Sequence, residues 1–325
     1  MQSRSHIHVI GALQESALIS RGLVVPEDAG GMGNAMPLRA VQSRATIREA
    51  WSAFWQDPAS GLGCVRGAPD ITQALAAHWS SFAAATGPHA HILDLGCGAG
   101  AAASAIVARR PDLRVTGIDF ARVPAASDPR IRLLSDTPME LLPFAHAEFD
   151  AAVSQFGFEY SRTHKTAHQM ARVLKQAGRF SLLVHHAGSS VVAANRASLN
   201  AILAIQEMDM REAFLAGHTF TLTAKLSSLQ REHPGDTMVA ELSRSLPVRA
   251  RAGGERNTAW RALEEILAQE RAILEALDAC CVAPEELEGW LGPLQQTFAI
   301  APAGVLRKPD GTPIAWTIEG TRTGR

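Results

Sequence analysis

A glycine-rich turn between two short apolar segments is the part of the sequence best suited to bind a ligand. The apolar run 91–95 leads into glycines at alternate positions of 96–100. A second apolar run, 115–118, ends at the carboxylate of Asp119. Glycine lets the backbone adopt positive φ angles and approach a ligand closely, and the start of a following helix offers free N–H groups. A carboxylate at the tip of the neighbouring strand can accept hydrogen bonds from ribose hydroxyls. These features indicate binding of a nucleoside-containing cofactor.

The glycine spacing alone is compatible with two classes of nucleoside cofactor. Gly96, Gly98 and Ala101 fit the relaxed dinucleotide pattern G-x-G-x-x-G/A, so that nicotinamide binding stays open. Asp94 lies two residues before the first glycine, where its carboxylate would repel a pyrophosphate. The same carboxylate would favour a ligand with a cationic end, such as an amino acid or a sulfonium. Gly100 adds a third alternating glycine, and the whole pattern favours the cationic ligand.

The alternating glycine pattern after Asp94 resembles motif I of the class I S-adenosylmethionine-dependent methyltransferases. Three downstream segments are also similar to that family and lie in its order. Leu-Pro-Phe at 142–144 precedes 149–156, which resembles the fourth strand, and 171–180 resembles the following helix, turn and fifth strand. The resemblance covers residues 85–186 and implies S-adenosylmethionine as the cofactor and methyl transfer as the activity.

The alternation of apolar segments predicts an α/β fold. The resemblance implies a Rossmann-like, doubly wound sheet of seven strands with a C-terminal antiparallel hairpin and a helical cap insertion. The segment 119–130 is short and contains two prolines, so the usual second helix should be cut down or irregular. The expected strands are 91–95, 114–118, 131–134, 149–154 and 179–184, and the expected helices of the core are 100–110 and 163–175.

The chain is expected to divide into four segments. The glycine-rich composition near residue 30 indicates a flexible N-terminal extension, with Met32 or Met36 as an alternative start. The segments are 1–40, the extension; 41–187, two N-terminal helices and the cofactor-binding core; 188–290, a helical cap insertion that selects the substrate; and 291–325, the last two strands of the core sheet.

Helical periodicity outside the core is clearest in two pairs of segments. The N-terminal pair, 45–55 and 71–85, carries aromatic residues at helical spacing. The insertion contains the other pair, 193–214 and 258–281. Near the C-terminus, the apolar runs 295–301 and 313–319 flank a good turn at 308–311 and are expected to form the antiparallel hairpin.

The resemblance assigns cofactor contacts to residues that follow the first, second and fourth strands. Asp94 would face the amino group of the cofactor, Asp119 would bind the ribose hydroxyls, and Phe120 would lie against the adenine. Met139 and Glu140 are expected to shape the adenine wall mainly through backbone contacts. Contacts with the methionine part are expected from Gly96, Cys97, Gly98 and Gly100 in the turn and from Ser154, Gln155 and Phe156 after the fourth strand.

The acceptor side of the site is indicated by topology. Tyr160, the only tyrosine, lies with Glu159 just after the fourth strand, and His185 and His186 end the fifth strand. Tyr160 and both histidines are therefore candidate substrate-binding residues. Alternation along a strand points the histidines to opposite sides, so at most one should reach the pocket directly. A neutral histidine there could take a proton from the acceptor, which makes His185 and His186 the candidate catalytic residues.

Composition excludes several other classes of protein. The net charge is −1, so no overall field would attract nucleic acid or an anionic membrane. Apolar residues make up 46% of the chain, yet no apolar run reaches the roughly 18 residues of a membrane span. The four cysteines form neither a disulfide framework nor a zinc-binding spacing, so no metal is expected and a reducing cytoplasm is the simplest location.

The function expected from the sequence is methyl transfer from S-adenosylmethionine to an oxygen, nitrogen or carbon atom of a small molecule. Two alternatives stay open, an RNA or other nucleic-acid methyltransferase and a non-catalytic partner protein that binds S-adenosylmethionine. A nicotinamide-dependent oxidoreductase is a third, more distant alternative. The acceptor and the oligomeric state are not specified by any motif in the sequence.

Overall fold

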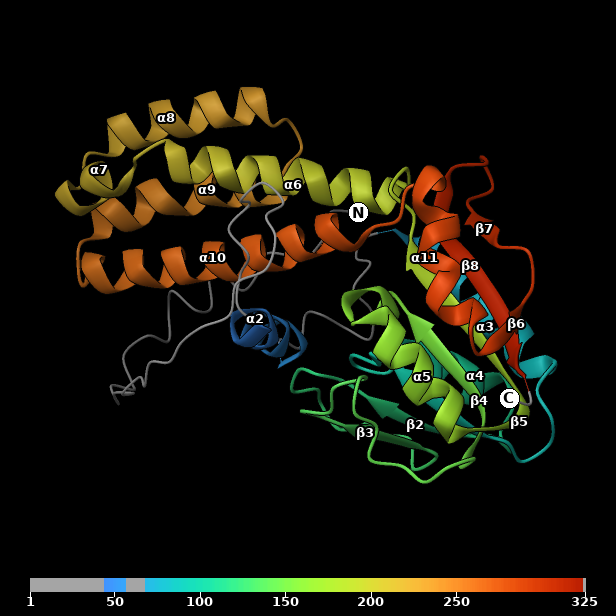
Figure 1. The fold of residues 1–325 in the computed structure, drawn as a ribbon. Coiled ribbons are helices and arrows are strands. Elements are labelled where there is room, and N and C mark those ends of the chain that lie inside the picture. The colour runs from blue at the N-terminus through green and yellow to red at the C-terminus, as the bar shows by residue number, and fades with distance from the viewer. Residues whose placement is uncertain (1–43, 57–67, 324–325) are drawn as a thin grey trace, which may run out of the picture.

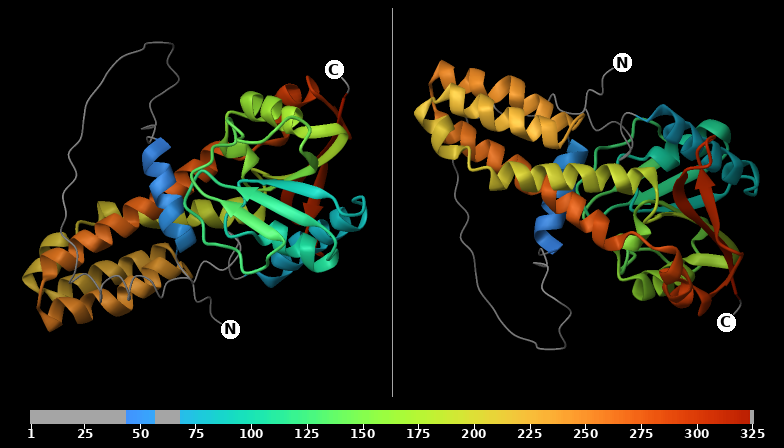
Figure 2. Two further views of the ribbon diagram at one scale, coloured as in Figure 1. Left: turned by 90° about the horizontal axis from the view of Figure 1, so that it is seen from below. Right: turned by 90° about the horizontal axis from the view of Figure 1, so that it is seen from above.

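The computed structural model describes residues 44–56 and 68–323, which form a sheet-based core and a long helical arm (Figure 1). The predicted N-terminal extension and its alternative start residues lie outside the described residues. Figure 2 shows from two further sides that the arm extends away from the sheet and that the N-terminal helix α2 lies beside it. The helices are α2 (Arg44–Gln56), α3 (Pro69–Ala84), α4 (Ala101–Arg109), α5 (Thr163–Val173), α6 (Ser190–Glu207), α7 (Arg211–Ala216), α8 (Thr219–Glu232), α9 (Thr237–Ala252), α10 (Arg256–Cys280) and α11 (Leu287–Gln295), with short 3-10 helices η2 (Phe158–Tyr160) and η3 (Pro284–Glu286).

A mixed sheet forms the centre of the core. Its strand order is β3-β2-β1-β4-β5-β8-β6, and β7 also pairs with β8. The strands from β1 to β5 are parallel, whereas β8 runs antiparallel to its three neighbours. This order confirms the Rossmann-like fold, and it reverses between β1 and β4, where open α/β sheets bind ligands. The strands are β1 (His91–Leu95), β2 (Arg114–Ile118), β3 (Ile131–Leu134), β4 (Phe149–Gln155), β5 (Leu174–His185), β6 (Phe298–Ile300), β7 (Gly304–Arg307) and β8 (Pro313–Arg322).

The C-terminal strands differ in one respect from the predicted hairpin. The sequence predicts a hairpin between 295–301 and 313–319, but the turn at 308–311 joins β7 to β8, and β6 pairs with the other end of β8. The turn closes through a hydrogen bond from Gly311 N to Lys308 O, and Gly311 has a φ of 86°. β7 has only four residues and none of them is fully buried, so it lacks the apolar pattern typical of a core strand.

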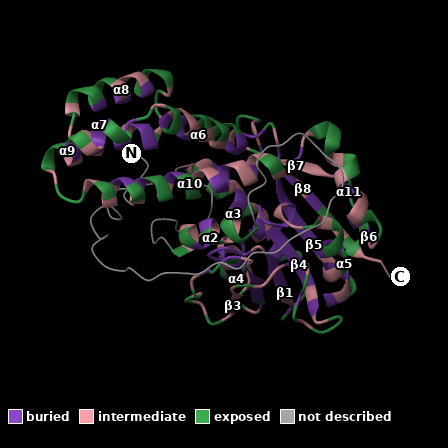
Figure 3. Cartoon of the chain, turned by 60° about the vertical axis from the view of Figure 1, so that its left-hand side comes forward, coloured by how far each residue is buried: buried purple, intermediate pink, exposed green. Residues whose placement is uncertain are grey.

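Helices cover both faces of the sheet because side chains alternate between the faces of each strand. Leu93 and Leu95 of β1 belong to the apolar cluster that includes α5 and α11. Ile92, which precedes Leu93 in the strand, belongs to the opposite cluster, which includes α3 and α4. Figure 3 shows that buried residues concentrate in the strands, while the arm helices carry exposed residues on their outer surfaces.

The arm is a helical bundle with a core of its own. Leucine and other apolar side chains of α6 to α10 form one buried cluster, which does not include residues of the sheet. Ser189 is the N-cap of α6, and its hydroxyl accepts a hydrogen bond from Val192 N. Asp236 caps α9 in the same way, by accepting from Val239 N. The sequence predicts one helix over 193–214. The structure divides it into α6 and α7 at Asp209, which has a φ of 41°.

Most of the other predicted elements are confirmed within a few residues of their predicted ends. The segments 45–55 and 71–85 form α2 and α3, and 258–281 forms α10. The fully described segment 119–130 contains no helix, in agreement with its prolines. None of the described helices combines the length and the apolar composition needed to cross a bilayer.

Candidate functional site

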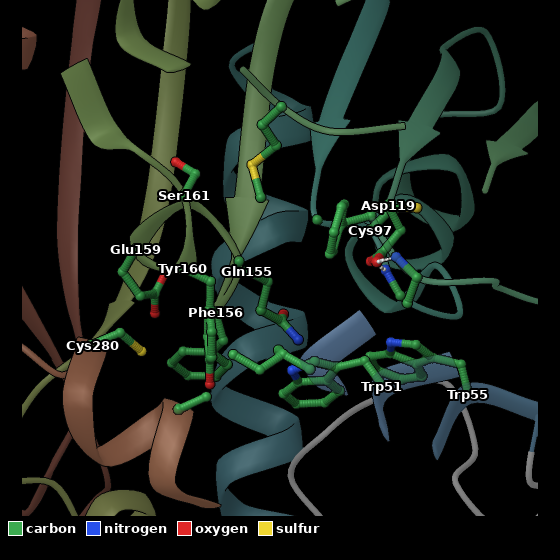
Figure 4. A pocket seen from close by; sticks show the side chains of 18 of the residues that line it. Trp51, Trp55, Cys97, Asp119, Gln155, Phe156, Glu159, Tyr160, Ser161 and Cys280 are labelled. Carbon is green, nitrogen blue, oxygen red and sulfur yellow. Dashed lines mark hydrogen bonds between the residues drawn. The ribbon is translucent and has the colours of Figure 1, made fainter. Parts of the chain in front are cut away.

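A pocket of about 340 Å³ lies at the carboxyl ends of β1, β2 and β4, where α2 and the last turns of α10 cover it. Figure 4 shows Asp119 and Cys97 at one end, Glu159 and Cys280 at the other, and Gln155 between them. We call the first end, formed by Asp94, residues 96–98 and Asp119, the glycine-turn end. The second end, formed by residues 156 and 159–160 with Cys280, is called the Glu159 end.

The glycine turn is held by backbone hydrogen bonds to β2. The N–H groups of Gly96 and Cys97 both donate to Ile118 O, each at 2.9 Å. Gly96 and Gly98 have φ values of 69° and 50°, which residues other than glycine adopt only at a cost in free energy. A Cβ on Gly96 would lie only 2.9 Å from Gly157 Cα. The turn therefore requires glycine for its conformation and for its close approach to the end of β4.

Asp94 is a buried carboxylate whose oxygens make no hydrogen bond of full geometry with the described residues, and the nearby Ala103 N–H opposes the effect of burial on its pKa only in part. Its side chain lines the pocket and the residue is only 1% exposed. Burial, and to a smaller degree the nearby Asp119 carboxylate, raises the pKa of Asp94 to about 7. An ionised carboxylate in this position is destabilising unless a cation or a donor pairs with it. The site is therefore complementary to a ligand that carries a cationic group.

Asp119 is held by two backbone N–H groups. Its Oδ2 accepts from Gly98 N and its Oδ1 from Ala121 N, both at 2.8 Å. Burial raises the pKa of Asp119 to about 6, although these hydrogen bonds act in the opposite direction. Two carboxylate oxygens provide about four acceptor positions, so the side chain retains capacity to accept two ligand hydroxyls. This arrangement fits a ribose.

Helix α2 is attached over the glycine-turn end by polar contacts. Arg44 forms an ion pair with Glu140 at 2.9 Å and lies over the Phe120 ring at 5.0 Å. Arg48 pairs with Asp136 at 2.8 Å, on the same loop after β3. Each ion pair is partly exposed and contributes little by itself, but together they keep α2 over the pocket. The Trp55 ring is so close to Gly98 that it would collide with a Cβ there.

The Glu159 end contains a buried acidic residue bonded to a histidine. Glu159 Oε1 accepts from His185 Nδ1 at 2.7 Å and from His185 N at 2.9 Å. Both side chains are almost fully buried. Among the described residues, Glu159 Oε2 and His185 Nε2 have no hydrogen-bond partner. The imidazole packs against the Phe156 ring at 4.4 Å and lies edge-on to the Tyr160 ring at 6.0 Å.

Most of the residues that the resemblance implies are brought together in this pocket. Glu140 differs in detail, because it contributes a side-chain ion pair to Arg44 rather than a backbone contact alone. Gln155 is oriented by Trp79, whose Nε1 donates to Gln155 Oε1 at 2.6 Å. The expected contact residues that line the pocket are Asp94, Gly96, Cys97, Gly98, Asp119, Phe120, Met139, Glu140, Gln155, Phe156 and Tyr160. Their roles toward a ligand stay predictions.

Four of the expected contact residues do not line the pocket. Gly100 precedes α4 as its N-cap, and a Cβ there would contact the Leu133 side chain at 3.4 Å. Ser154 is buried, and its hydroxyl donates to Leu95 O and accepts from Phe158 N. His185 reaches the pocket only through Glu159. His186 stacks on Trp316 at 4.4 Å, away from the other histidine.

Helices remote in sequence supply the pocket residues that the sequence does not assign. Trp51 and Trp55 stack at 5.9 Å on α2, and their i, i+4 spacing was the available signal. Ala276, Ala279 and Cys280 of α10 carry no motif, and only the return of α10 from the arm brings them to the site. Within the described residues, no cluster of three or more potential metal ligands occurs.

Comparison with known proteins supports the interpretation of the glycine turn. The family model described as a methyltransferase domain matches residues 93–182, from β1 into β5. This segment contains Asp94, the glycine turn, Asp119 and the Glu159 helix. No curated protein matches the sequence significantly.

Several solved structures are similar over most of their length, at low sequence identity. One of them comes from the complex between the Haloferax volcanii Trm112 methyltransferase activator and a methyltransferase. It is 13% identical, the match covers 84% of this chain and 97% of that chain, and the TM-score is 0.48. Another is the Burkholderia thailandensis 1,6-didemethyltoxoflavin-N1-methyltransferase, bound to 1,6-didemethyltoxoflavin and S-adenosylhomocysteine. It is 14% identical, the match covers 92% of this chain and 94% of that chain, and the TM-score is 0.46. A plantazolicin methyltransferase in complex with S-adenosylhomocysteine is 11% identical, with 85% and 95% covered and a TM-score of 0.44. These TM-scores lie below 0.5, so the fold assignment rests on the strand order and on the family match.

Proposed function

We propose that this chain, whose residues 93–182 match the model of the methyltransferase-domain family, transfers a methyl group from S-adenosylmethionine to a small-molecule acceptor. The observation that carries the proposal is the unpaired, buried Asp94 carboxylate beside the glycine turn. It would complement the cationic methionine end of this cofactor, and Asp119 would accept hydrogen bonds from the ribose hydroxyls. A pyrophosphate would meet two carboxylates at the same position, which disfavours a nicotinamide dinucleotide.

The residues of the chain would align the reactants and exclude water. When bound, S-adenosylmethionine supplies a methyl group already activated on a sulfonium. Asp94 and Asp119 would orient it from the glycine-turn end, while Trp51 and Trp55 of α2 cover the pocket from outside. The acceptor would lie at the Glu159 end, in line with the methyl group. The Glu159–His185 pair is the buried group there that could hold or remove a proton.

The first prediction concerns ligand choice and tests the cofactor assignment directly. Calorimetric titration of the purified chain should show saturable binding of S-adenosylhomocysteine and no binding of NAD at the same concentrations. Incubation with methyl-labelled S-adenosylmethionine and pooled metabolites should then label a small molecule. Binding of NAD alone would overturn the proposal. Binding of S-adenosylhomocysteine with no labelled acceptor in any pool would favour the non-catalytic partner protein.

The assay with labelled cofactor also separates a small-molecule acceptor from a nucleic acid. Label in a mixed RNA pool at near-physiological salt, with none in the metabolite pool, would favour a nucleic-acid methyltransferase. We expect the reverse, because the acceptor end of the pocket is enclosed by Tyr160 and by the small residues Ala276 and Ala279 of α10. The net charge of −1 gives no general attraction to polyanions.

A second prediction compares the two neighbouring histidines. Replacing His185 with alanine should lower turnover at least tenfold, because it removes the partner of Glu159 at the acceptor end. Replacing His186 with alanine should leave turnover within about twofold, because that ring packs on Trp316. The affinity for S-adenosylhomocysteine should be unchanged in both variants. Unchanged turnover in both would remove the histidines from the mechanism.

A further inference from the structure

The acceptor end of the pocket contains a buried acidic side chain whose hydrogen-bond partner among the described residues is His185. Glu159 has no exposed side-chain surface, and its Oε2 has no hydrogen-bond partner among the described residues. Among the described residues that line the pocket, Arg44 is the one lysine or arginine, and it is paired with Glu140 on the other side. Buried polar groups in native structures are normally satisfied, so an unpaired carboxylate oxygen in a pocket indicates a missing ligand donor.

The position of Glu159 is fixed rather than adaptable. It lies in the short helix η2 directly after β4, and its Oε1 is held by both the backbone and the ring of His185. These two hydrogen bonds leave Oε2 without a partner among the described residues, and a ligand that binds it must displace the side chains that cover it. A carboxylate held in one orientation by its partners can place a ligand atom accurately.

The rest of this end is aromatic or small. Phe156 and Tyr160 flank the acidic group, and Trp51 lies edge-on to the Tyr160 ring at 5.9 Å. Aromatic faces attract cations as well as flat apolar groups, and the attraction is stronger when water is excluded. Ala276 and Ala279 of α10 line the same region and leave room for a ligand. A carboxylate within an aromatic enclosure is the chemistry that recognises an amine.

We propose that the methyl acceptor is an amine on an aromatic or similarly flat molecule, and that the free carboxylate oxygen of Glu159 binds its nitrogen. This inference rests on the proposed function and names its substrate class. Glu159 would be a catalytic residue, since it contacts the reacting nitrogen, and His185 would be a positioning residue that acts through Glu159. A hydroxyl acceptor would satisfy the hydrogen bond but would bring no positive charge to the carboxylate or to the aromatic faces around it.

The chemical step balances with the groups present. The ammonium form of the acceptor binds by its charge and first gives one proton to Glu159 Oε2, which frees the nitrogen lone pair. The lone pair forms the new N–C bond while the S–C bond breaks, and the electron pair of that bond stays on sulfur, which becomes a neutral thioether. The methylated product leaves as an ammonium ion, and the proton on Glu159 returns to solvent when the pocket opens.

The test compares matched amines and alcohols on the full chain saturated with S-adenosylhomocysteine. The probes are tryptamine with tryptophol and benzylamine with benzyl alcohol, and calorimetry measures their dissociation constants. We expect at least one amine to bind ten times more tightly than its alcohol. Glu159→Gln should remove that preference and leave the affinity for S-adenosylhomocysteine within threefold. Glu288→Gln, at an exposed position on α11, is the matched control and should retain it.

The possible outcomes distinguish this inference from the function on which it rests. Equal binding of amines and alcohols, tighter binding of the alcohols, or no binding by any of the four probes would overturn the amine acceptor alone. Failure of S-adenosylhomocysteine to bind would overturn the proposed function and this inference with it. The wild-type comparison stands without any variant, so a folding defect in Glu159→Gln would not remove the test.

Discussion

Replacing Asp94 with asparagine should stabilise the cofactor-free protein at pH 8 and weaken its affinity for S-adenosylmethionine at the same time. The folded state raises the pKa of this carboxyl from 3.8 to about 7. Ionisation therefore destabilises the folded state relative to the unfolded one, and stability is lost as the pH rises from about 4 to about 7. At pH 8 the full destabilisation of the folded state by the ionised carboxylate is present, and a neutral asparagine does not cause it.

The size of this effect can be bounded. A shift of about three pKa units corresponds to about 4 kcal/mol at ~1.4 kcal/mol per unit. The buried amide still lacks partners, so we expect about 2 kcal/mol of added stability and a rise in Tm of about 4 °C. Loss of a charged hydrogen bond to the ligand is worth about 1.5–3 kcal/mol, which corresponds to a roughly 10- to 100-fold weaker affinity. Wild-type affinity should also fall as the pH is lowered through 7, and the affinity of the variant should not.

Thermal unfolding at pH 5 and pH 8, with calorimetry of cofactor binding at both, measures each part of this prediction. Asp128→Asn is the control with opposite sign, because pairing with Arg130 lowers the pKa of Asp128 to about 2. That substitution should lower stability at pH 8 and leave cofactor affinity unchanged. If Asp94→Asn lost stability at pH 8, or bound the cofactor as tightly as the wild type, Asp94 would not be an unpaired carboxylate facing the ligand.

Replacing Gly96 with alanine should abolish measurable cofactor binding. The residue has a φ of 69°, which costs an alanine about 1–2 kcal/mol. The added Cβ would also lie 2.9 Å from the backbone of Gly157 and 3.2 Å from Met139 Cε. The methionine can move, but the end of β4 is fixed in the sheet, so the turn must shift. We expect the affinity for S-adenosylhomocysteine to fall at least about 100-fold and the protein to lose about 2–3 kcal/mol of stability.

Gly292 provides a matched control for this substitution. It lies within α11, and a Cβ there would meet no atom within 4 Å. Gly292→Ala should be neutral or should stabilise the protein by about 0.5–1 kcal/mol, with cofactor affinity unchanged. Titration calorimetry and chemical unfolding of the two variants, side by side, measure both effects. Equal behaviour of the two variants would contradict a specific role of the glycine turn.

The secondary structure of the core was predictable because its signals are local. The strands 91–95, 114–118 and 131–134 are found with the predicted bounds, since each is a short apolar run between turn residues. The helix predicted over 193–214 breaks at Asp209, which has a φ of 41° and lies between α6 and α7. β7 was not predicted, because a short strand at the edge of a sheet can form from a segment with few apolar residues.

The glycine-turn end of the pocket was also predictable, because its residues follow strands whose order is set by the fold. Asp94, Gly96, Gly98 and Asp119 lie together as the resemblance implies, although their contacts with a ligand stay predictions. Ser154 was expected at the same site but bonds to the backbone instead. Successive side chains at the end of a strand point to opposite faces of the sheet, and the local sequence does not specify which of these side chains borders the pocket.

By itself, the sequence determined the likeness of residues 93–182 to a methyltransferase domain, the parallel strands and the turn that would hold the methyl donor. Those features arise from contacts between residues close in the chain or from a motif with fixed spacing. Only the tertiary structure decided what surrounds the acceptor, because that end combines α2, η2, the end of β5 and the last turns of α10. The pairing of Glu159 with His185 and the aromatic cover from α2 depend on packing between segments distant in sequence, and no local pattern records such packing.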